Sequence, residues 1–309
     1  MKKPANTLPA GLPDRVPEIT PGQYEDGTPL HQVQFLECKI ILKPDRFDSL
    51  RSFAEYAKLV KHTALAAGVE FSNEKASVRP EIREVLFLDT ANYALYNHAF
   101  ILRRRIRYED GFPVGEPEVV FKFRHPDIQT AASLDVRPKL PGKYDIKFKA
   151  EALPLKERVG GYRMLFSHNV QFPLSQAPDG DRTSMKTLTR IFPCLASVLK
   201  TPADHVELVN QTVVEEVLQD LGKLSFGKGM AAKFNVAIWR ERGFHRPLVG
   251  EFAFQLKFKS RDELHDKPLD RAKRFFIALQ ENGRDYVSPG TTKTGVAYRL
   301  KGNPPQAHE

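Results

Sequence analysis

Short runs of alternating apolar and charged residues recur along the chain, and each predicts a β-strand with one apolar and one charged face. The most regular run is GEFAFQLKFKS at 250–260, in which Phe and Leu alternate with Glu, Gln and Lys. In the run that ends near Leu42, Cys38 and Ile40 share a face, while Glu37 and Lys39 share the other. The predicted strands are residues 31–42, 86–88, 103–107, 119–124, 144–151, 234–243, 250–260 and 287–300.

Two stretches have apolar residues at helical spacing instead. Residues 48–68 predict an amphipathic helix that ends at a glycine, and residues 262–282 predict a second one. Residues 158–206 are irregular and predict an insertion of helices and loops. The first 30 residues hold six prolines and little apolar material, so we expect a disordered arm there, and a disordered tail at 302–309. Residues 31–301 are expected to form a single domain.

The charged faces of these strands are rich in Arg and Lys. In FILRRRIR, the side chains of Arg103, Arg105 and Arg107 share one face, and Leu102 and Ile106 share the other. A half-buried sheet that turns its polar face to water would carry a more mixed set of polar residues. A barrel with charged residues inside and apolar residues outside, beneath helices, satisfies both faces. The pattern therefore predicts an α+β fold, an antiparallel barrel of about eight strands with a charged lumen flanked by helices.

Composition narrows the class of protein. The 309 residues are 41% hydrophobic, with 47 Lys and Arg against 38 Asp and Glu, a formal net charge of +9. This charge suits nucleic acid, membrane surfaces or phosphorylated small molecules. The two cysteines, Cys38 and Cys194, are too few and too far apart for a thiolate metal site or a disulfide framework. Without an apolar membrane span, and with prolines near the start where a signal peptide would be apolar, we expect a cytoplasmic protein.

One stretch imitates a nucleotide-binding loop. Residues 222–229, GKLSFGKG, nearly match the P-loop, but Gly229 stands where a Ser or Thr would ligate Mg²⁺. A helical pattern precedes it where a P-loop requires a strand, so we discount it. The histidines lack ligand spacing, and a zinc site is not supported.

Taken in order, several segments resemble the CYTH domain, also called the triphosphate tunnel metalloenzyme superfamily. LFLDTANYALYNHAFILRRRIR at 86–107 is similar to that family's "FDT…L…G.ALRIR" signature, and Glu37-Cys38-Lys39 to the end of its ExExK motif. VVFKFR at 119–124 resembles its lysine-bearing strand, and Glu241-Arg242-Gly243 its "DRG" turn. GEFAFQLKFKS resembles its "ELELELK" strand, and TTKTGVAYRL at 291–300 its closing "SKYARG" segment.

The resemblance implies a tunnel that binds a triphosphate along Arg and Lys side chains, with carboxylates that hold Mg²⁺ or Mn²⁺ for attack by water on the terminal phosphate. On this basis Glu37, Glu251 and Lys39 are candidate catalytic residues, and Glu37, Glu241 and Glu251 are candidate metal ligands. The candidate substrate-binding residues are Arg103, Arg105, Arg107, Lys122, Arg124, Lys147, Lys149, Lys257, Lys259 and Lys293.

Three positions depart from the family pattern. Phe35 stands where ExExK has its first Glu, and Ala253 and Gln255 stand where the late strand has carboxylates. Two functions remain as alternatives. One is metal-dependent hydrolysis of a triphosphate or short polyphosphate, and the other is binding of a phosphorylated ligand without turnover, which the lost carboxylates favour. RNA binding is a further alternative, but the basic residues lie within strands and lack interleaved exposed aromatics.

Overall fold

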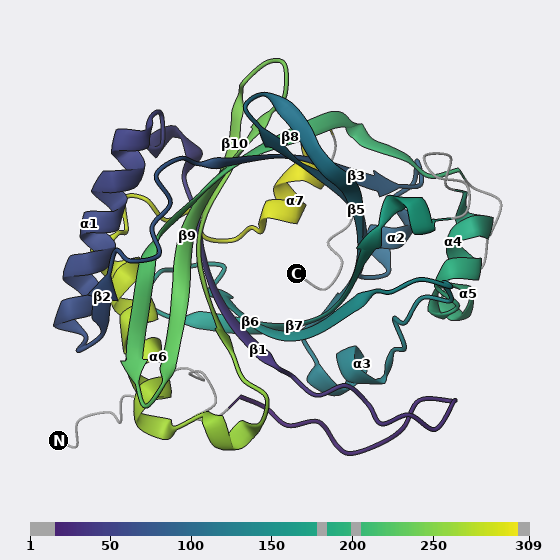
Figure 1. Ribbon diagram of the computed structural model, residues 1–309, viewed down its shortest axis with the longest axis horizontal. Helices are drawn as coiled ribbons and strands as arrows, with labels where there is room; N and C mark the ends of the chain where they lie inside the picture. The colour runs from purple at the N-terminus through teal and green to yellow at the C-terminus, as the bar shows by residue number, and fades with distance from the viewer. Residues whose placement is uncertain (1–15, 178–183, 199–204, 302–309) are drawn as a thin grey trace, which may run out of the picture.

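The computed structural model describes residues 16–177, 184–198 and 205–301, whose strands form a ring with most of the helices outside it and one short helix within its outline (Figure 1). The strands are β1 (Phe35–Leu42), β2 (Glu70–Ser72), β3 (Glu81–Asp89), β4 (Phe100–Glu109), β5 (Phe112–His125), β6 (Asp145–Pro154), β7 (Tyr162–Pro173), β8 (Glu207–Gly227), β9 (Met230–Glu241) and β10 (Pro247–Lys257). The helices are α1 (Leu50–Ala66), α2 (Ala94–Asn97), α3 (Ile128–Ser133), α4 (Met185–Ile191), α5 (Cys194–Val198), α6 (Asp266–Asn282) and α7 (Lys293–Tyr298).

Within the described residues, nine strands close into a barrel, in the order β8-β3-β4-β5-β7-β6-β1-β10-β9 and back to β8. Pairing of β8 with β9 closes the ring, and the short β2 is added outside it, on β8. All pairs are antiparallel except β1 with β6. The predicted barrel is confirmed, with nine strands in place of about eight.

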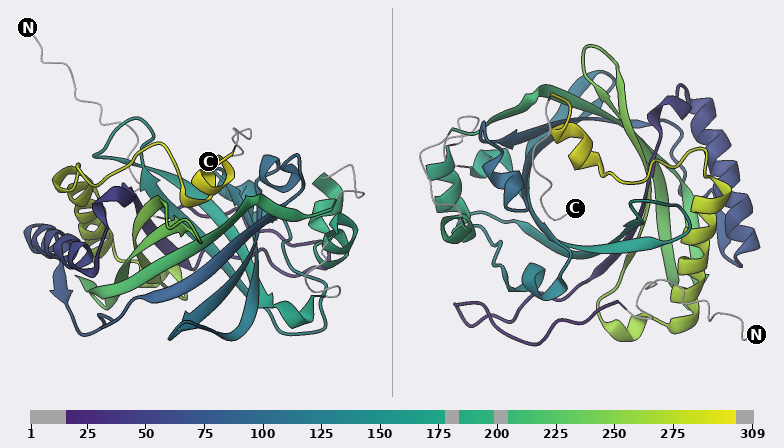
Figure 2. Two further views of the ribbon diagram at one scale, coloured as in Figure 1. Left: turned by 90° about the horizontal axis from the view of Figure 1, so that it is seen from above. Right: turned by 180° about the vertical axis from the view of Figure 1, so that it is seen from behind.

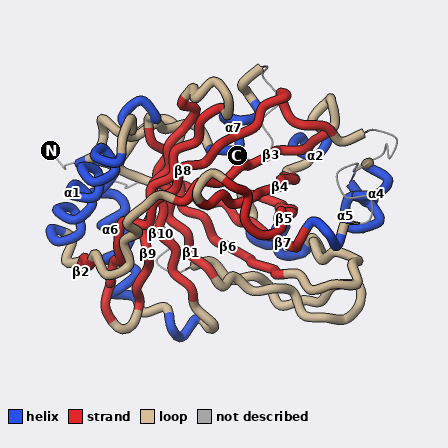
Figure 3. Tube along the Cα trace, turned by 45° about the horizontal axis from the view of Figure 1, so that its top comes forward, coloured by secondary structure: helices blue, strands red, loops and turns tan. Residues whose placement is uncertain are grey.

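Apolar side chains on the outer face of the barrel pack beneath helices, as the alternation predicts. Phe252 and Phe254 of β10 lie in one buried cluster with residues of α1 and α6, and Phe121 of β5 stacks on Phe192, which follows α4. Figure 3 shows these two groups of helices on opposite sides of the strands. Because the helices cover the apolar faces, the charged faces of the same strands turn inward. No helix among the described residues is long and apolar enough to cross a membrane.

The last predicted strand is wrong, because residues 293–298 form the helix α7. Thr292 caps this helix by accepting a hydrogen bond from the backbone N–H of Gly295 at 3.0 Å. The ring of Tyr298 stacks on that of Tyr96, with centroids 4.2 Å apart. These contacts hold α7 against the inner wall at one end of the barrel (Figure 2).

The predicted insertion at 158–206 is only partly helical. It contains α4 and α5, but it also contains the barrel strand β7, which pairs with β5 and β6. Polar residues interrupt the apolar alternation of β7, in the order Phe166, Ser167, His168, Asn169, Val170. Because the alternation is interrupted, the sequence does not reveal β7 as a strand, although β5 and β6 both pair with it in the barrel.

The predicted disordered arm is too long. Residues 16–30 pack along the barrel, and Val16, Ile19, Tyr24 and Leu30 are each at most 7% exposed. The hydroxyl of Tyr24 donates a hydrogen bond to the backbone carbonyl of Ala132 in α3, the helix that follows β5. Few apolar residues are therefore enough to fix a proline-rich segment when a large surface is already in place. The rest of the predicted arm, 1–15, and the predicted tail, 302–309, lie outside the described residues.

Candidate functional site

The inner face of the barrel surrounds a lumen of about 290 Å³ that is strongly basic. Carboxylates on its wall are few, namely Glu37, Glu216 and Glu251. The basic residues that line it are Lys39, Arg83, Arg103, Arg105, Lys122, Arg124, Lys147, Lys149 and Lys293. Nine cations against three carboxylates leave an excess of positive charge in a small space, which an anionic ligand would relieve.

A first charge cluster is built around Glu151, which is fully buried behind the lumen wall. Its carboxylate contacts the ammonium of Lys122 at 2.6 Å, that of Lys39 at 3.3 Å and the guanidinium of Arg124 at 3.4 Å. Burial alone would raise the pKa of Glu151, but these cations outweigh it and hold the pKa well below its usual range. One ionised carboxylate therefore orients three of the lumen's cations.

A second cluster lies beside α7. The ammonium of Lys293 contacts a carboxylate oxygen of Glu251 at 2.9 Å and one of Glu216 at 3.1 Å, and it lies 4.7 Å from the centre of the Trp239 ring. The indole N–H of Trp239 donates to Glu216 at 2.7 Å. Burial opposes ionisation of Glu216, but Lys293 and Arg83 lower its pKa to about 2. Both carboxylates are therefore neutralised by the protein itself.

Arg103 differs from the other lumen arginines because its guanidinium makes no ion pair or hydrogen bond with any residue in the described part of the chain. Burial, and then the neighbouring charge of Arg105, lower the pKa of Arg103 to about 10. Lys147 forms no ion pair within the described ranges either, and its ammonium donates only to the amide oxygen of Gln171 at 3.3 Å. These two cations have the capacity to bind an added anion.

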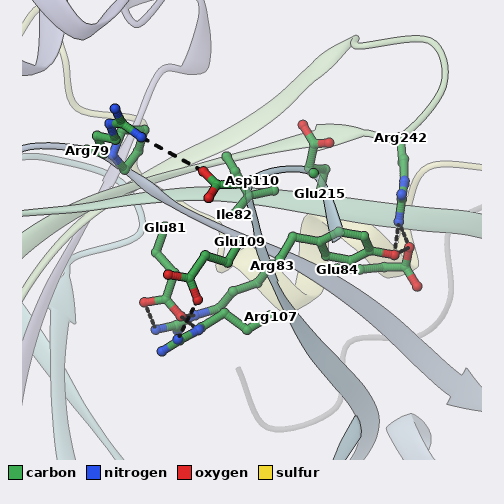
Figure 4. Close-up of a pocket in the computed structure, with 13 residues that line it drawn as sticks. Arg79, Glu81, Ile82, Arg83, Glu84, Arg107, Glu109, Asp110, Glu215 and Arg242 are labelled. Atoms are coloured by element: carbon green, nitrogen blue, oxygen red, sulfur yellow. Dashed lines mark hydrogen bonds and ion pairs between the residues drawn. The ribbon is translucent and has the colours of Figure 1, made fainter. Parts of the chain in front are cut away.

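A larger groove, of about 630 Å³, shares Arg83 with the lumen, and Figure 4 shows the residues that line it. Its charges are balanced, because four arginines face five carboxylates. Arg79 pairs with Asp110 at 3.8 Å, and Arg242 pairs with Glu84. The lumen, with its excess of cations, is therefore the better anion site despite its smaller volume.

The structure brings most of the predicted residues into the lumen. The predicted residues on its wall are Glu37, Lys39, Arg103, Arg105, Lys122, Arg124, Lys147, Lys149, Glu251 and Lys293. Four do not reach it. Arg107 lies in the groove near Glu81, Glu241 pairs with Arg246 at 3.0 Å, and Lys257 and Lys259 are exposed at and beyond the end of β10. The alternation along a strand shows which face a side chain is on. It does not show whether that side chain lies in the middle of the lumen or at its rim.

Three residues of the site were not among the predicted ones. Glu151 shares a face with Lys147 and Lys149, so the alternation could have found it. Arg83 lies just before the predicted start of its strand. Glu216 lies on β8, where the spacing of Val213, Val217 and others imitates a helix.

The predicted metal ligands do not meet. In the ladder between β1 and β10, Glu37 pairs with Gln255 and Glu251 with Ile41. The two glutamates are thus four residues apart along the strands, about 13 Å. Glu37 is held by Lys39 at 2.7 Å and Lys149 at 3.3 Å, which outweigh burial and lower its pKa to about 2. Among the described residues, no group of three or more His, Cys, Asp or Glu side chains is placed to hold a metal. The donor set does not fit the predicted metal centre.

The structure is a closed barrel with a cationic lumen, the architecture that the motifs predict. Solved structures similar to it include HpAC1 from Hippeastrum, a candidate adenylyl cyclase with a dominant triphosphatase activity, at 14% identity and a TM-score of 0.42, covering 90% of this chain and 100% of its own. PH1819 from Pyrococcus horikoshii is 15% identical at a TM-score of 0.33, covering 84% and 96%.

A third, a candidate adenylate cyclase from Bacillus halodurans, is 9% identical at a TM-score of 0.36, covering 84% of this chain and 95% of its own. At these identities the similarity concerns the fold alone. No protein-family model matches the sequence, and a search of curated proteins finds no relative.

Proposed function

We propose that the lumen binds the phosphate chain of a triphosphate or short polyphosphate. The observation that carries this proposal is Arg103, a lumen-facing guanidinium without an ion pair among the described residues, whose pKa is lowered by burial and by Arg105. A cation in this state is destabilised until an anion arrives. Because the cations face an enclosed lumen, they favour a small phosphorylated ligand over RNA.

The arrangement of the cations suits an extended ligand. Arg103 and Arg105 lie two residues apart on β4, and Lys147 and Lys149 lie two apart on β6, so each pair follows the strand direction. Two other strands, β5 and β7, separate β4 from β6, and the two pairs therefore reach the lumen from different sides. Successive phosphates could each meet a charge-assisted contact, which is about twice as strong as a neutral hydrogen bond.

Hydrolysis of the terminal phosphate requires more than binding. Arg105 and Lys122 could neutralise charge on the attacked phosphate, but a general base works best with a pKa near the working pH. The pKa of Glu37 is about 2 and its carboxylate is engaged by two lysines, so it is a poor base for water. We therefore limit the proposal to binding. Hydrolysis would be added to the proposal if the unmodified protein released phosphate in the presence of Mg²⁺ or Mn²⁺ and the Glu37→Gln variant did not.

Calorimetric titration with tripolyphosphate at constant ionic strength tests the proposal. Arg103→Gln should weaken binding by about tenfold or more, since a hydrogen bond to a charged group contributes about 1.5–3 kcal/mol. The matched control is Arg51→Gln, which removes the same charge from an exposed position on α1. Equal losses in the two variants would show that binding depends on net charge and not on the lumen.

A further inference from the structure

Lys293 occupies a special place among the lumen cations, because its ammonium lies between two carboxylates that come from strands on either side of β9. It contacts Glu251 of β10 at 2.9 Å and Glu216 of β8 at 3.1 Å. Both contacts are ion pairs, and Lys293 also lines the lumen. Two carboxylates around one cation resemble the protein's share of a Mg²⁺ site, in which substrate phosphates supply further ligands.

We propose that the Lys293 ammonium serves as a built-in cation at this position, so that the lumen takes the phosphate chain free of divalent metal. This inference rests on the proposed function and specifies the form of its ligand. An ammonium has three N–H donors. Two are directed to Glu216 and Glu251, and the third is available to a phosphate oxygen in the lumen that Lys293 lines.

The charge of the lumen supports the same conclusion. Each carboxylate on its wall already has a lysine or arginine partner, and nine cations face three carboxylates. A bound Mg²⁺ would add two positive charges to this excess and cancel two negative charges of the ligand. Electrostatic complementarity therefore favours the metal-free polyanion over its magnesium complex.

Titration of the unmodified protein with tripolyphosphate, first with EDTA and then with saturating Mg²⁺, tests the inference. We expect binding in EDTA and an apparent affinity at least about tenfold weaker in Mg²⁺. The reason is that Mg²⁺ binds tripolyphosphate and so lowers the concentration of the metal-free polyanion. Binding that requires Mg²⁺, or that Mg²⁺ tightens, would overturn the inference and leave the proposed function intact. Absence of binding under both conditions would overturn the proposed function itself.

Lys293→Met gives a second test, because it keeps the aliphatic stem beside Trp239 and removes the charge. Glu216 and Glu251 then lose the cation they share, although Glu216 keeps Arg83 at 3.4 Å. Mn²⁺ should therefore raise the melting temperature of the variant and leave that of the unmodified protein unchanged. The control is Lys233→Met, which removes an exposed lysine of β9 that pairs with Asp220 at 3.4 Å. Equal responses to Mn²⁺ in Lys293→Met and the unmodified protein would count against the inference.

Glu251→Gln keeps the inference testable if Lys293→Met does not fold. It removes a negative charge from the lumen and leaves Lys293 paired with Glu216. If Lys293 supplies the cation, tripolyphosphate should bind this variant more tightly in EDTA, by about threefold or more. If Glu251 were needed to hold a metal for the ligand, the variant would bind tripolyphosphate more weakly than the unmodified protein in the presence of Mg²⁺, and that result would contradict the inference.

Discussion

Glu151 organises the lumen at the scale of a single residue. It is fully buried and contacts Lys39, Lys122 and Arg124, and its Oε1 also accepts a hydrogen bond from the hydroxyl of Ser167. A buried carboxylate with this many partners does not by itself add much stability over an apolar core. Its removal is costly, because the carboxylate that offsets the mutual repulsion of these three cations is lost, although Lys39 keeps Glu37 at 2.7 Å.

Glu151→Gln should therefore lower the free energy of unfolding at pH 7 by about 3–5 kcal/mol. The pKa of Glu151 lies well below its usual range, so its stabilisation is present above the unfolded pKa of about 4.3 and is lost as the pH falls toward the folded value. The difference between variant and unmodified protein, measured by urea unfolding, should shrink below about pH 4. Glu118→Gln, which removes the partly exposed partner of Arg105, is the control. Similar losses in both variants would contradict this account.

Residues in regular alternation were predictable, and residues placed by tertiary contacts were not. The faces of Glu37, Lys122 and Lys147 follow from strand parity, which the sequence shows directly. Whether a residue lies at the centre or the rim depends on strand register, and this separates Arg105 from Arg107. Register comes from pairing between distant segments, for which a single sequence carries little signal.

At the scale of elements, α7 shows how a short segment can escape prediction. The segment that contains it, TTKTGVAYRL at 291–300, alternates well enough to suggest a strand. Because β8 pairs with β9 and closes the barrel, there is no place in the ring for another strand. The same segment instead begins at the cap Thr292 and buries Tyr298 against Tyr96. Conversely, β8 has helical spacing but is a strand of 21 residues, with irregular register at Asp220 and Gly222 that disrupts its alternation.

Thr292→Ala tests the importance of the cap for the site. It should lower the free energy of unfolding by about 1 kcal/mol, because the N–H of Gly295 loses its acceptor. Since Lys293 follows directly, affinity for tripolyphosphate should fall as well, and Thr292→Ser should restore both. The neighbouring Thr291→Ala leaves this cap intact and is the control. If affinity is unchanged in a destabilised Thr292→Ala protein, the cap does not position Lys293.

At the scale of the whole molecule, the barrel satisfies two opposite requirements of the sequence. The apolar faces of the strands are buried under α1, α6 and the helices on the far side, which provides the stability of the fold. The same closure forces nine cations to share one lumen. In the unliganded protein these cations therefore repel one another. Part of this repulsion is offset by the carboxylates Glu37, Glu151, Glu216 and Glu251.

A polyanion that enters the lumen should relieve the remaining repulsion and stabilise the whole fold. A ligand that binds only the folded state raises the free energy of unfolding by RT ln(1 + [L]/Kd), about 2.7 kcal/mol at a hundredfold excess over Kd. Tripolyphosphate should therefore raise the urea midpoint progressively with its concentration, whereas chloride at equal ionic strength acts only through screening. Arg103→Gln should show a smaller rise than Arg51→Gln. If both salts shift the midpoint equally, the lumen has no specific site, because screening alone then accounts for the stabilisation.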